Sequence, residues 1–323
     1  MTITTCLSNC FNEIQVQFGL NLIDKKNIKT GTENSFSSGF LFPSFKGSIL
    51  LFFLLLSSFS VSASQVLIPM DAETQENHLK AYGITYWTLE KGIKVQWLLN
   101  YRGGAFLLPD SEELRKECQI RGVSFEVISD QKTGEILDEI NSPSRNMEAV
   151  LLEKAPKIAV YSPEGNKPWD DAVTMVLTYA EIPYETIYDE EVLNDALLLF
   201  DWLHLHHEDF TGQYGKFYRS YRTAPWYIED KKQAEALASR LGYDKVSEEK
   251  LAVALKIRDY VVGGGFMFAM CSATDSFDIA LSAEGVDICE SMFDGDPSES
   301  NYQNKIDYDR SFAFAEFILE RNP

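Results

Sequence analysis

The chain has 323 residues, of which 45% are hydrophobic and 24% charged, a globular composition that excludes disordered and collagen-like classes. Its formal net charge of −20 at pH 7 repels phosphate backbones, so we predict no nucleic-acid partner. The length is sufficient for two domains.

An apolar run, ILLFFLLL at 49–56, lies near the N-terminus. Lys46 precedes it, and small residues follow it up to Ser64. A positive residue, a short apolar core and a small-residue cleavage site are typical of a secretory signal peptide. The run is too short to span a bilayer, which takes about 20 apolar residues. We therefore predict a signal region at 1–64, export to the periplasm, cell envelope or medium, and no stable membrane span after cleavage.

Residues 1–40 are polar and longer than the charged start of a signal peptide, which indicates a translation start near residue 40. In the mature chain, the turn-rich segment NSPSRN at 141–146 predicts a domain boundary. We expect a small α/β domain at 65–146 and a larger α/β domain at 147–323.

The first domain begins with a short predicted strand at 66–70. The segment GITYWTLEKGIKVQWLLNY at 83–101 is rich in β-branched and aromatic residues, which predicts two strands around a turn at Lys91-Gly92. A serine N-cap and two glutamates in the first turn predict a helix at 111–121. A strand at 123–128 and a helix at 131–140 follow.

Strands and helices alternate in the second domain. The pattern predicts a strand at 157–161, a short strand and turn in ETIYDEEVL at 185–193, and central strands in ALLLFDWLHLHH at 196–207 and GGGFMFAM at 263–270. It also predicts a helix at 168–182, two helices across 229–262, and a tight turn followed by a helix in CSATDSFDIALSAEG at 271–285. Such alternation predicts a doubly wound, mainly parallel sheet. Because ligands bind at the carboxyl ends of parallel strands, we expect a site at 204–209 or at Cys271.

Cys271 follows one of these strands and opens a helix. A nucleophile there is exposed on a sharp turn, backbone N–H groups can hold an oxyanion, and the helix dipole favours the thiolate. We predict that Gly264, Gly265, Ser272 and Asp275 bind substrate beside it. The alternative is a buried structural cysteine.

Three of the four histidines lie in HLHHED at 204–209. On a strand, His204 and His206 share one face and His207 takes the other. His206 or His207 is a candidate base for Cys271, oriented by Glu208. Two histidines and a carboxylate are also a possible zinc-like site, and histidines packed at a strand end are a third interpretation. We predict no bound metal and no cofactor.

Two other stretches carry polar side chains. The loop at 210–227 interleaves aromatic and basic residues, including Tyr214 and Arg222, which predicts either a substrate-binding lid or a loop held by aromatic packing. The stretch DGDPSESN at 294–301 has the oxygen-rich composition of a calcium loop but not its spacing, which predicts a solvated turn.

Residues 157–285 resemble the class I glutamine amidotransferase-like fold, a flavodoxin-like group that includes ThuA-like and DJ-1-like proteins. The resemblance rests on Cys271, which follows the Gly-rich strand GGGFMFAM as the nucleophile elbow does in that fold. The usual elbow reads G-x-C-x-G, whereas Ala269 and Ser272-Ala273 stand here in place of its glycines. The resemblance implies a cysteine nucleophile acting on an acyl or C–N bond.

Over nearly all of 65–323, the chain resembles exported bacterial proteins often labelled asparagine synthetase B. HLKAYGITYW, WLLNYRGGAFLLP, WLHLHHEDFTGQYGKFY and GGGFMFAMCSATDSFDIAL carry this resemblance. A glutamine-dependent asparagine synthetase needs an N-terminal cysteine and an S-G-G-x-D-S loop for ATP. Processing here exposes Ser64 or Gln65, and residues 271–276 lack the glycines that let a backbone approach phosphate. The motifs of that reaction are therefore missing.

These observations predict an exported, cysteine-dependent hydrolase or amidase with a small-molecule or peptide-like substrate. A non-catalytic envelope binding protein on the same fold is one alternative. A metal-dependent hydrolase that uses the HLHHED stretch is another.

The export prediction is tested by N-terminal sequencing of the protein from its native source. We expect the first residue to be near Ser64 or Gln65, because cleavage removes the apolar run. Cytosolic protein that begins at Met1 would contradict the prediction.

Overall fold

The computed structural model describes residues 64–163, 172–214 and 217–320. The predicted signal region, apart from Ser64, lies outside them. The described chain divides into two compact units, one comprising 64–76, 95–116 and 124–152, and the other 77–94, 117–123 and the residues from 153 onward. No helix within the described ranges is long and apolar enough to cross a membrane.

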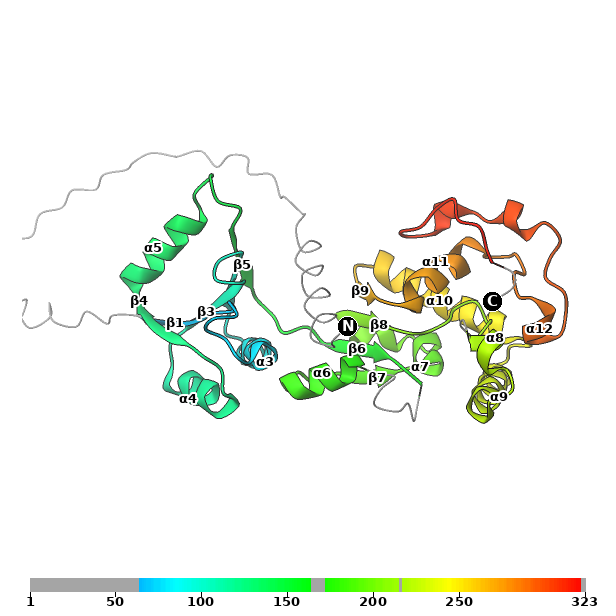
Figure 1. Ribbon diagram of the computed structural model, residues 1–323, viewed down its shortest axis with the longest axis horizontal. Coiled ribbons are helices and arrows are strands. Elements are labelled where there is room, and N and C mark those ends of the chain that lie inside the picture. The colour runs from blue at the N-terminus through cyan, green and yellow to red at the C-terminus, as the bar shows by residue number, and fades with distance from the viewer. Residues whose placement is uncertain (1–63, 164–171, 215–216, 321–323) are drawn as a thin grey trace, which may run out of the picture. The chain divides into compact units, whose positions relative to one another are not determined.

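The first unit is an antiparallel sheet with the strand order β4-β1-β3-β2-β5 (Figure 1). Its strands are β1 (Ser64–Ile68), β2 (Val95–Leu99), β3 (Ala105–Pro109), β4 (Glu126–Ser129) and β5 (Glu148–Leu152). Ile136 and Ile140 of helix α5 (Asp130–Ile140) pack in one cluster with Leu67, Leu98 and Leu107 of the strands. The turn at 141–146 leads from α5 into β5, which pairs with β2 of the same sheet.

Local signals identify several elements of this part of the chain. The strand predicted at 66–70 and the helices predicted at 111–121 and 131–140 are present as β1, α4 (Glu112–Arg121) and α5. The hydroxyl oxygen of Ser111 accepts a hydrogen bond from the N–H of Leu114 at 3.1 Å, as a serine N-cap does.

The segment 83–101 does not form the two strands predicted around Lys91-Gly92. Its first part belongs to helix α3 (His78–Glu90), and only its second part forms a strand, β2. The buried side chains of α3 follow the helical spacing i, i+3, i+4, i+7 and i+8, and comprise Ala81, Ile84, Thr85, Thr88 and Leu89. These β-branched and aromatic residues therefore form a helix, because tertiary packing overrides their weak local preference for strands.

Helix α3 packs against α6 (Ala172–Ala180). Gly83 is a point of close approach, since a Cβ atom added there would lie 1.8 Å from the carbonyl oxygen of Ala180. Only glycine, which has no Cβ, fits at this contact.

The second unit is built on a parallel sheet with the strand order β7-β6-β8-β9 (Figure 1). Its strands are β6 (Ile158–Tyr161), β7 (Glu185–Ile187), β8 (Trp202–Leu205) and β9 (Phe266–Ala269). The helices between and after the strands are α6, α7 (Asp189–Leu193), α8 (Tyr218–Tyr221), α9 (Pro225–Arg240), α10 (Val246–Val262), α11 (Ser272–Ser282) and α12 (Ser291–Asp294). The predicted α/β class with a mainly parallel sheet is confirmed at this level.

The side chains of β6 alternate between two hydrophobic clusters, as strand geometry requires. Ala159 and Tyr161 pack with residues of α7, α10 and α11. Ile158 and Val160 pack instead with residues of α6 and α3. Helices therefore cover both faces of the sheet, and its strand ends remain as places for a site.

Two apolar runs of the second unit differ from their predictions. In 196–207, the first four residues form a 3₁₀ turn and the strand begins only at Trp202. The strand in GGGFMFAM, predicted to be central, lies at the edge of the described sheet as β9. An apolar run indicates burial but specifies neither its length as a strand nor its neighbours. The exposed Leu198, with 77% of its surface accessible, shows that part of one run is not core.

A buried group of ionisable side chains joins the carboxyl ends of β6 and β7 to α10. The Nζ atom of Lys250 lies 2.6 Å from a carboxylate oxygen of Asp189 and 3.1 Å from the hydroxyl oxygens of Tyr161 and Tyr188. Tyr161 also donates a hydrogen bond to Asp189. Glu249, next to Lys250, is buried in the same region. Mutual pairing offsets the cost of removing these charges from water.

This cluster predicts a pH-dependent stability. Burial raises the pKa of Glu249 to about 8, and the Asp189 carboxylate adds to the rise while Lys250 opposes it. Between about pH 4.5 and 8 the folded protein therefore holds a proton that the unfolded chain releases, so the free energy of unfolding falls as pH rises through this window. We expect Glu249→Gln to remove a decline of up to about 1.4 kcal/mol per pH unit, measured by urea unfolding.

The neighbouring Glu248 provides the matched control, because it lies on the same helix and is exposed. Glu248→Gln should keep the slope of the wild-type protein. Parallel pH profiles for the wild type and Glu249→Gln would show that Glu249 does not carry the effect.

Candidate functional site

Cys271 stands at the turn between β9 and α11. The N–H of Met270 makes a hydrogen bond to the carbonyl oxygen of Leu205 at 3.1 Å, and α11 begins at Ser272. The backbone of Cys271 has φ 54° and ψ −135°, a region that residues other than glycine rarely adopt. The residue is exposed. An exposed side chain on a strained strand-to-helix turn has the geometry of a nucleophile elbow.

The first turn of α11 leaves one backbone donor beside the cysteine. The N–H of Ala273 donates to the carbonyl oxygen of His206, and that of Thr274 to the carbonyl oxygen of Cys271, each at 3.3 Å. Within the described residues, the N–H of Ser272 has no acceptor. The residue after the nucleophile is the one that supplies an oxyanion donor in an elbow, and the helix dipole strengthens such a donor.

The histidine loop is tied to the same helix turn. Besides the bond to His206, the hydroxyl of Ser272 donates to the carbonyl oxygen of His207, and the hydroxyl of Ser276 to that of Glu208, each at 2.8 Å. The two strand ends identified separately in the sequence therefore form one site. Ser276 was not predicted here, although serines in a first helical turn commonly bond to nearby backbone.

The three histidines have different surroundings. His204 is buried, its ring stacks on Phe268, and burial, with His206 as a further cause, lowers its pKa to about 3. It is therefore a neutral core residue. The rings of His206 and His207 have centroids 3.5 Å apart. Neither ring makes a hydrogen bond to the Cys271 sulfur within the described residues, so the base stays a prediction; such bonds are often long before substrate binds.

The carboxylate of Glu208 accepts a hydrogen bond from the backbone N–H of His206 at 2.7 Å. This bond acts on the conformation of the loop, because its donor is main chain and not an imidazole. Asp275 belongs to the first turn of α11, and its carboxylate accepts a hydrogen bond from the N–H of Ser276 at 3.0 Å.

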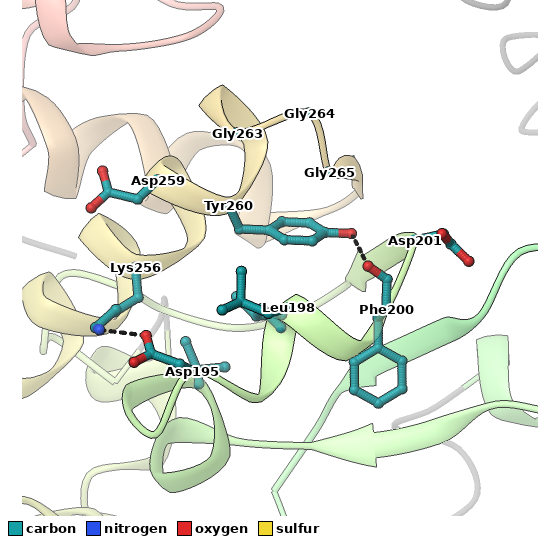
Figure 2. A pocket seen from close by; sticks show the side chains of 12 residues that line it. Asp195, Leu198, Phe200, Asp201, Lys256, Asp259, Tyr260, Gly263, Gly264 and Gly265 are labelled. Carbon is teal, nitrogen blue, oxygen red and sulfur yellow. Dashed lines mark hydrogen bonds and ion pairs between the residues drawn. The ribbon is translucent and has the colours of Figure 1, made fainter.

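Two predicted substrate-binding residues lie at the other end of β9. Gly264 and Gly265 precede the strand, whereas Cys271 follows it. The four residues of β9, which rise about 3.3 Å each, place the two ends of the strand about 13 Å apart. The glycines instead line a cavity of about 440 Å³ (Figure 2). The ring of Tyr260 lies 2.2 Å from where a Cβ of Gly265 would stand, so this glycine makes room for the ring. Neither glycine joins the cysteine site.

Tyr214 and Arg222 have their interactions with other residues of the loop and of α9. The ring of Tyr214 is 6.2 Å from that of Tyr227, and the Nζ atom of Lys231 lies 5.5 Å from its centroid. The exposed Arg222 donates to the carbonyl oxygen of Arg219 at 2.8 Å, after the end of α8. Within the described residues, no hydrogen bond, ion pair or ring contact joins either side chain to Cys271 or the histidines. This arrangement matches the interpretation of a loop held by aromatic packing.

In the described ranges, one group of three side chains has the spacing of a metal site: Asp287, Asp294 and Asp296. The Nζ atom of Lys245 lies 2.9, 3.3 and 2.7 Å from their oxygens, and its hydrogen bonds, the one to Asp296 first, raise its pKa. An ammonium group thus occupies the centre of this cluster. The stretch 294–301 contributes two carboxylates to an ion-pair network.

The chain matches no protein-family model, and comparisons with curated proteins and with solved structures find no match. The resemblances to the amidotransferase-like fold and to the family labelled asparagine synthetase B therefore remain hypotheses.

We expect iodoacetamide to label Cys271 before the other cysteines of the described residues. Cys271 is exposed, whereas Cys118 and Cys289 are buried. Burial raises the pKa of Cys118 to about 12 and also raises that of Cys289, which keeps both thiols protonated and unreactive. Peptide mass spectrometry after brief labelling at neutral pH gives the order, with urea-denatured protein as the control. Earlier labelling of a buried cysteine in folded protein would contradict the geometry.

Proposed function

We propose that the protein is an exported cysteine-dependent hydrolase that cleaves an amide or other acyl bond, with Cys271 as the nucleophile. The conformation of this residue carries the proposal, because it is exposed and has φ 54° at a strand-to-helix turn. Such backbone strain costs about 1–3 kcal/mol and concentrates at functional sites. A structural cysteine needs neither strain nor exposure. Export is proposed from the apolar run at 49–56, which lies outside the described residues.

The strand order supports a doubly wound fold of the class I glutamine amidotransferase-like kind. Numbered in chain order, the parallel sheet reads 2-1-3-4, which is the start of the flavodoxin-like order 2-1-3-4-5. Ligands of such sheets bind outside the carboxyl ends of the strands, which is where Cys271 and His206 lie.

The proposed reaction has two stages. The thiolate of Cys271 attacks the carbonyl carbon, a C–S bond forms, and the N–H of Ser272 donates to the resulting oxyanion. Collapse of this intermediate breaks the C–N bond, and His206 or His207, which has taken the thiol proton, returns it to the leaving amine. Water then hydrolyses the thioester, which releases the carboxylic acid and restores the thiol. Glu208 acts as a positioning residue through its bond to the loop backbone.

The decisive experiment compares the wild type with Cys271→Ser on a panel of fluorogenic amides of single amino acids and dipeptides. We expect the variant to lose activity on the order of 10³-fold or more, because the nucleophile is removed. His206→Ala and His207→Ala, made separately, should lose unequal amounts, with a fall of about 10²-fold or more for the one that is the base.

Cys118→Ala is the matched control, since it removes a buried thiol of α4 and should keep the activity. Equal rates for the wild type and Cys271→Ser would overturn the assignment of the nucleophile. An unreactive Cys271, together with no hydrolysis of any amide, would favour the non-catalytic envelope binding protein.

A further inference from the structure

The second unit contains a cavity of about 440 Å³ at the end of the sheet where β8 and β9 begin (Figure 2). Its walls come from the turn that precedes β8, from the carboxyl end of α10 and from the three glycines that follow this helix. Small-molecule sites in proteins have volumes of about 300–1,000 Å³, so the cavity has the size of such a site. Cys271 follows β9 at the other end of this strand, so the cavity is separate from the elbow and does not depend on its proposed function.

One part of the cavity wall is apolar. Leu197, Leu198 and the ring of Tyr260 contribute to it. Leu197 and Tyr260 are buried, whereas Leu198 is exposed and offers its side chain to a ligand without leaving the core. An organic ligand would therefore remove apolar surface of both partners from water when it binds here.

The ionisable groups of the wall have an acidic balance, because they comprise one lysine and the three aspartates Asp195, Asp201 and Asp259. The Nζ atom of the lysine, Lys256, lies 2.5 Å from a carboxylate oxygen of Asp195, which offsets its charge. Asp201 is paired with Lys154 at 2.8 Å. The lining therefore has no cation left to attract an anionic ligand.

Asp259 is the carboxylate that a ligand can share most easily. Its side chain is 66% accessible, and its ion pair among the described residues is with the adjacent Arg258, at 2.8 Å. Exposed ion pairs contribute little stability. Arg258 also lies 3.6 Å from Glu284, so it keeps a second carboxylate when a ligand approaches Asp259.

The carboxyl end of α10 is a second feature that favours a cation. The helix dipole gives this end of the 17-residue helix a partial negative charge, and its last turn contains no basic residue. Gly263 and Gly264, which follow the helix and line the cavity, have carbonyl oxygens that accept no hydrogen bond from any described residue. A Cβ atom added at Gly264 would have nothing within 4 Å, so the main chain borders open space there.

Tyr260 is a third feature of the same kind. Its ring forms part of the wall, and an aromatic face attracts organic cations. Its hydroxyl lies 3.4 Å from the carbonyl oxygen of Phe200 and 3.5 Å from that of Phe266, longer than the about 2.5–3.0 Å of a good O–H···O hydrogen bond. This buried hydroxyl therefore retains the capacity to bond a ligand in the cavity.

We propose that this cavity binds an organic cation, namely a primary amine that carries an apolar or aromatic group. The ammonium group binds at Asp259 and the carbonyl oxygens that follow α10, and the apolar group packs against Leu198 and the ring of Tyr260. The formal net charge of −20 attracts such a ligand from solution. A ligand with a carboxylate would face the charge of Asp259 and the negative end of the helix, which disfavours it.

The probe for this proposal is para-fluorophenethylamine, whose binding is followed by fluorine NMR at neutral pH and constant ionic strength. Its alcohol analogue has a hydroxyl in place of the ammonium group and nearly the same shape. We expect the amine to bind at least about tenfold more tightly than the alcohol, because the alcohol lacks the charge that the carboxylate and the helix end attract.

Two leucine variants locate the bound amine. Leu198→Arg places a cation in the wall of the cavity, whereas Leu199→Arg makes the same change of charge one residue further on, outside the wall. Both leucines are exposed, at 77% and 68%, so neither substitution disturbs the core. We expect the affinity for the amine to fall about tenfold or more in Leu198→Arg and to stay within about twofold of the wild type in Leu199→Arg.

A second pair of variants tests the carboxylate. Asp259→Asn removes the charge at the ammonium site and should weaken binding of the amine about fivefold or more, while binding of the alcohol stays the same. Glu248→Gln is the matched control, since Glu248 is an exposed carboxylate of the same helix that does not line the cavity. It should bind the amine as the wild type does.

No binding of the amine at millimolar concentration, or equal affinities for the amine and the alcohol, would overturn the proposal. Equal effects of Leu198→Arg and Leu199→Arg would also overturn it, because the attraction would then come from net charge or from another site. The same holds for equal effects of Asp259→Asn and Glu248→Gln. None of these results depends on the reactivity of Cys271, so the cavity and the hydrolase are tested separately.

Discussion

The hydrogen bonds between the first turn of α11 and the loop after β8 are the interaction on which the candidate site depends. One backbone N–H and two serine hydroxyls satisfy the carbonyl oxygens of His206, His207 and Glu208. These bonds can form because β8 and β9 are adjacent and parallel, which brings the carboxyl ends of both strands to the same end of the sheet. Without that pairing, the histidines and Cys271 would be unrelated features of two distant segments.

Cys271 differs from the two other cysteines of the described residues in its exposure and in its backbone conformation. Cys118 and Cys289 are buried and have raised pKa values, as expected of small core residues. Cys271 is exposed at a strained backbone position, with an N–H on the next residue that no described group accepts. Strain and exposure at Cys271 coincide with an available donor on the next residue, and that coincidence is what an acyl-transfer nucleophile requires.

Two lysines near the start of α10 organise carboxylates in this acidic chain. Lys245 is surrounded by Asp287, Asp294 and Asp296, and Lys250 is buried against Asp189. Each ammonium group offsets repulsion among acids that the fold brings close together. The Lys250 cluster lies at the carboxyl ends of β6 and β7, which is the same end of the parallel sheet as the candidate site.

The strand–helix alternation of the second unit and the place of Cys271 at a strand-to-helix junction could be predicted from the sequence, because apolar runs and turn residues act locally. The helix at 78–90 could not, since its β-branched and aromatic residues prefer strands until packing against α6 buries one helical face. That Gly264 and Gly265 lie at the opposite end of β9 from Cys271 became clear only from the bounds of this strand in the structure. The position of β9 beside β8 and the hydrogen bonds from Ala273 to His206 and from Ser272 to His207 were decided only by the tertiary structure, because the order of strands in a sheet depends on contacts between residues far apart in the chain.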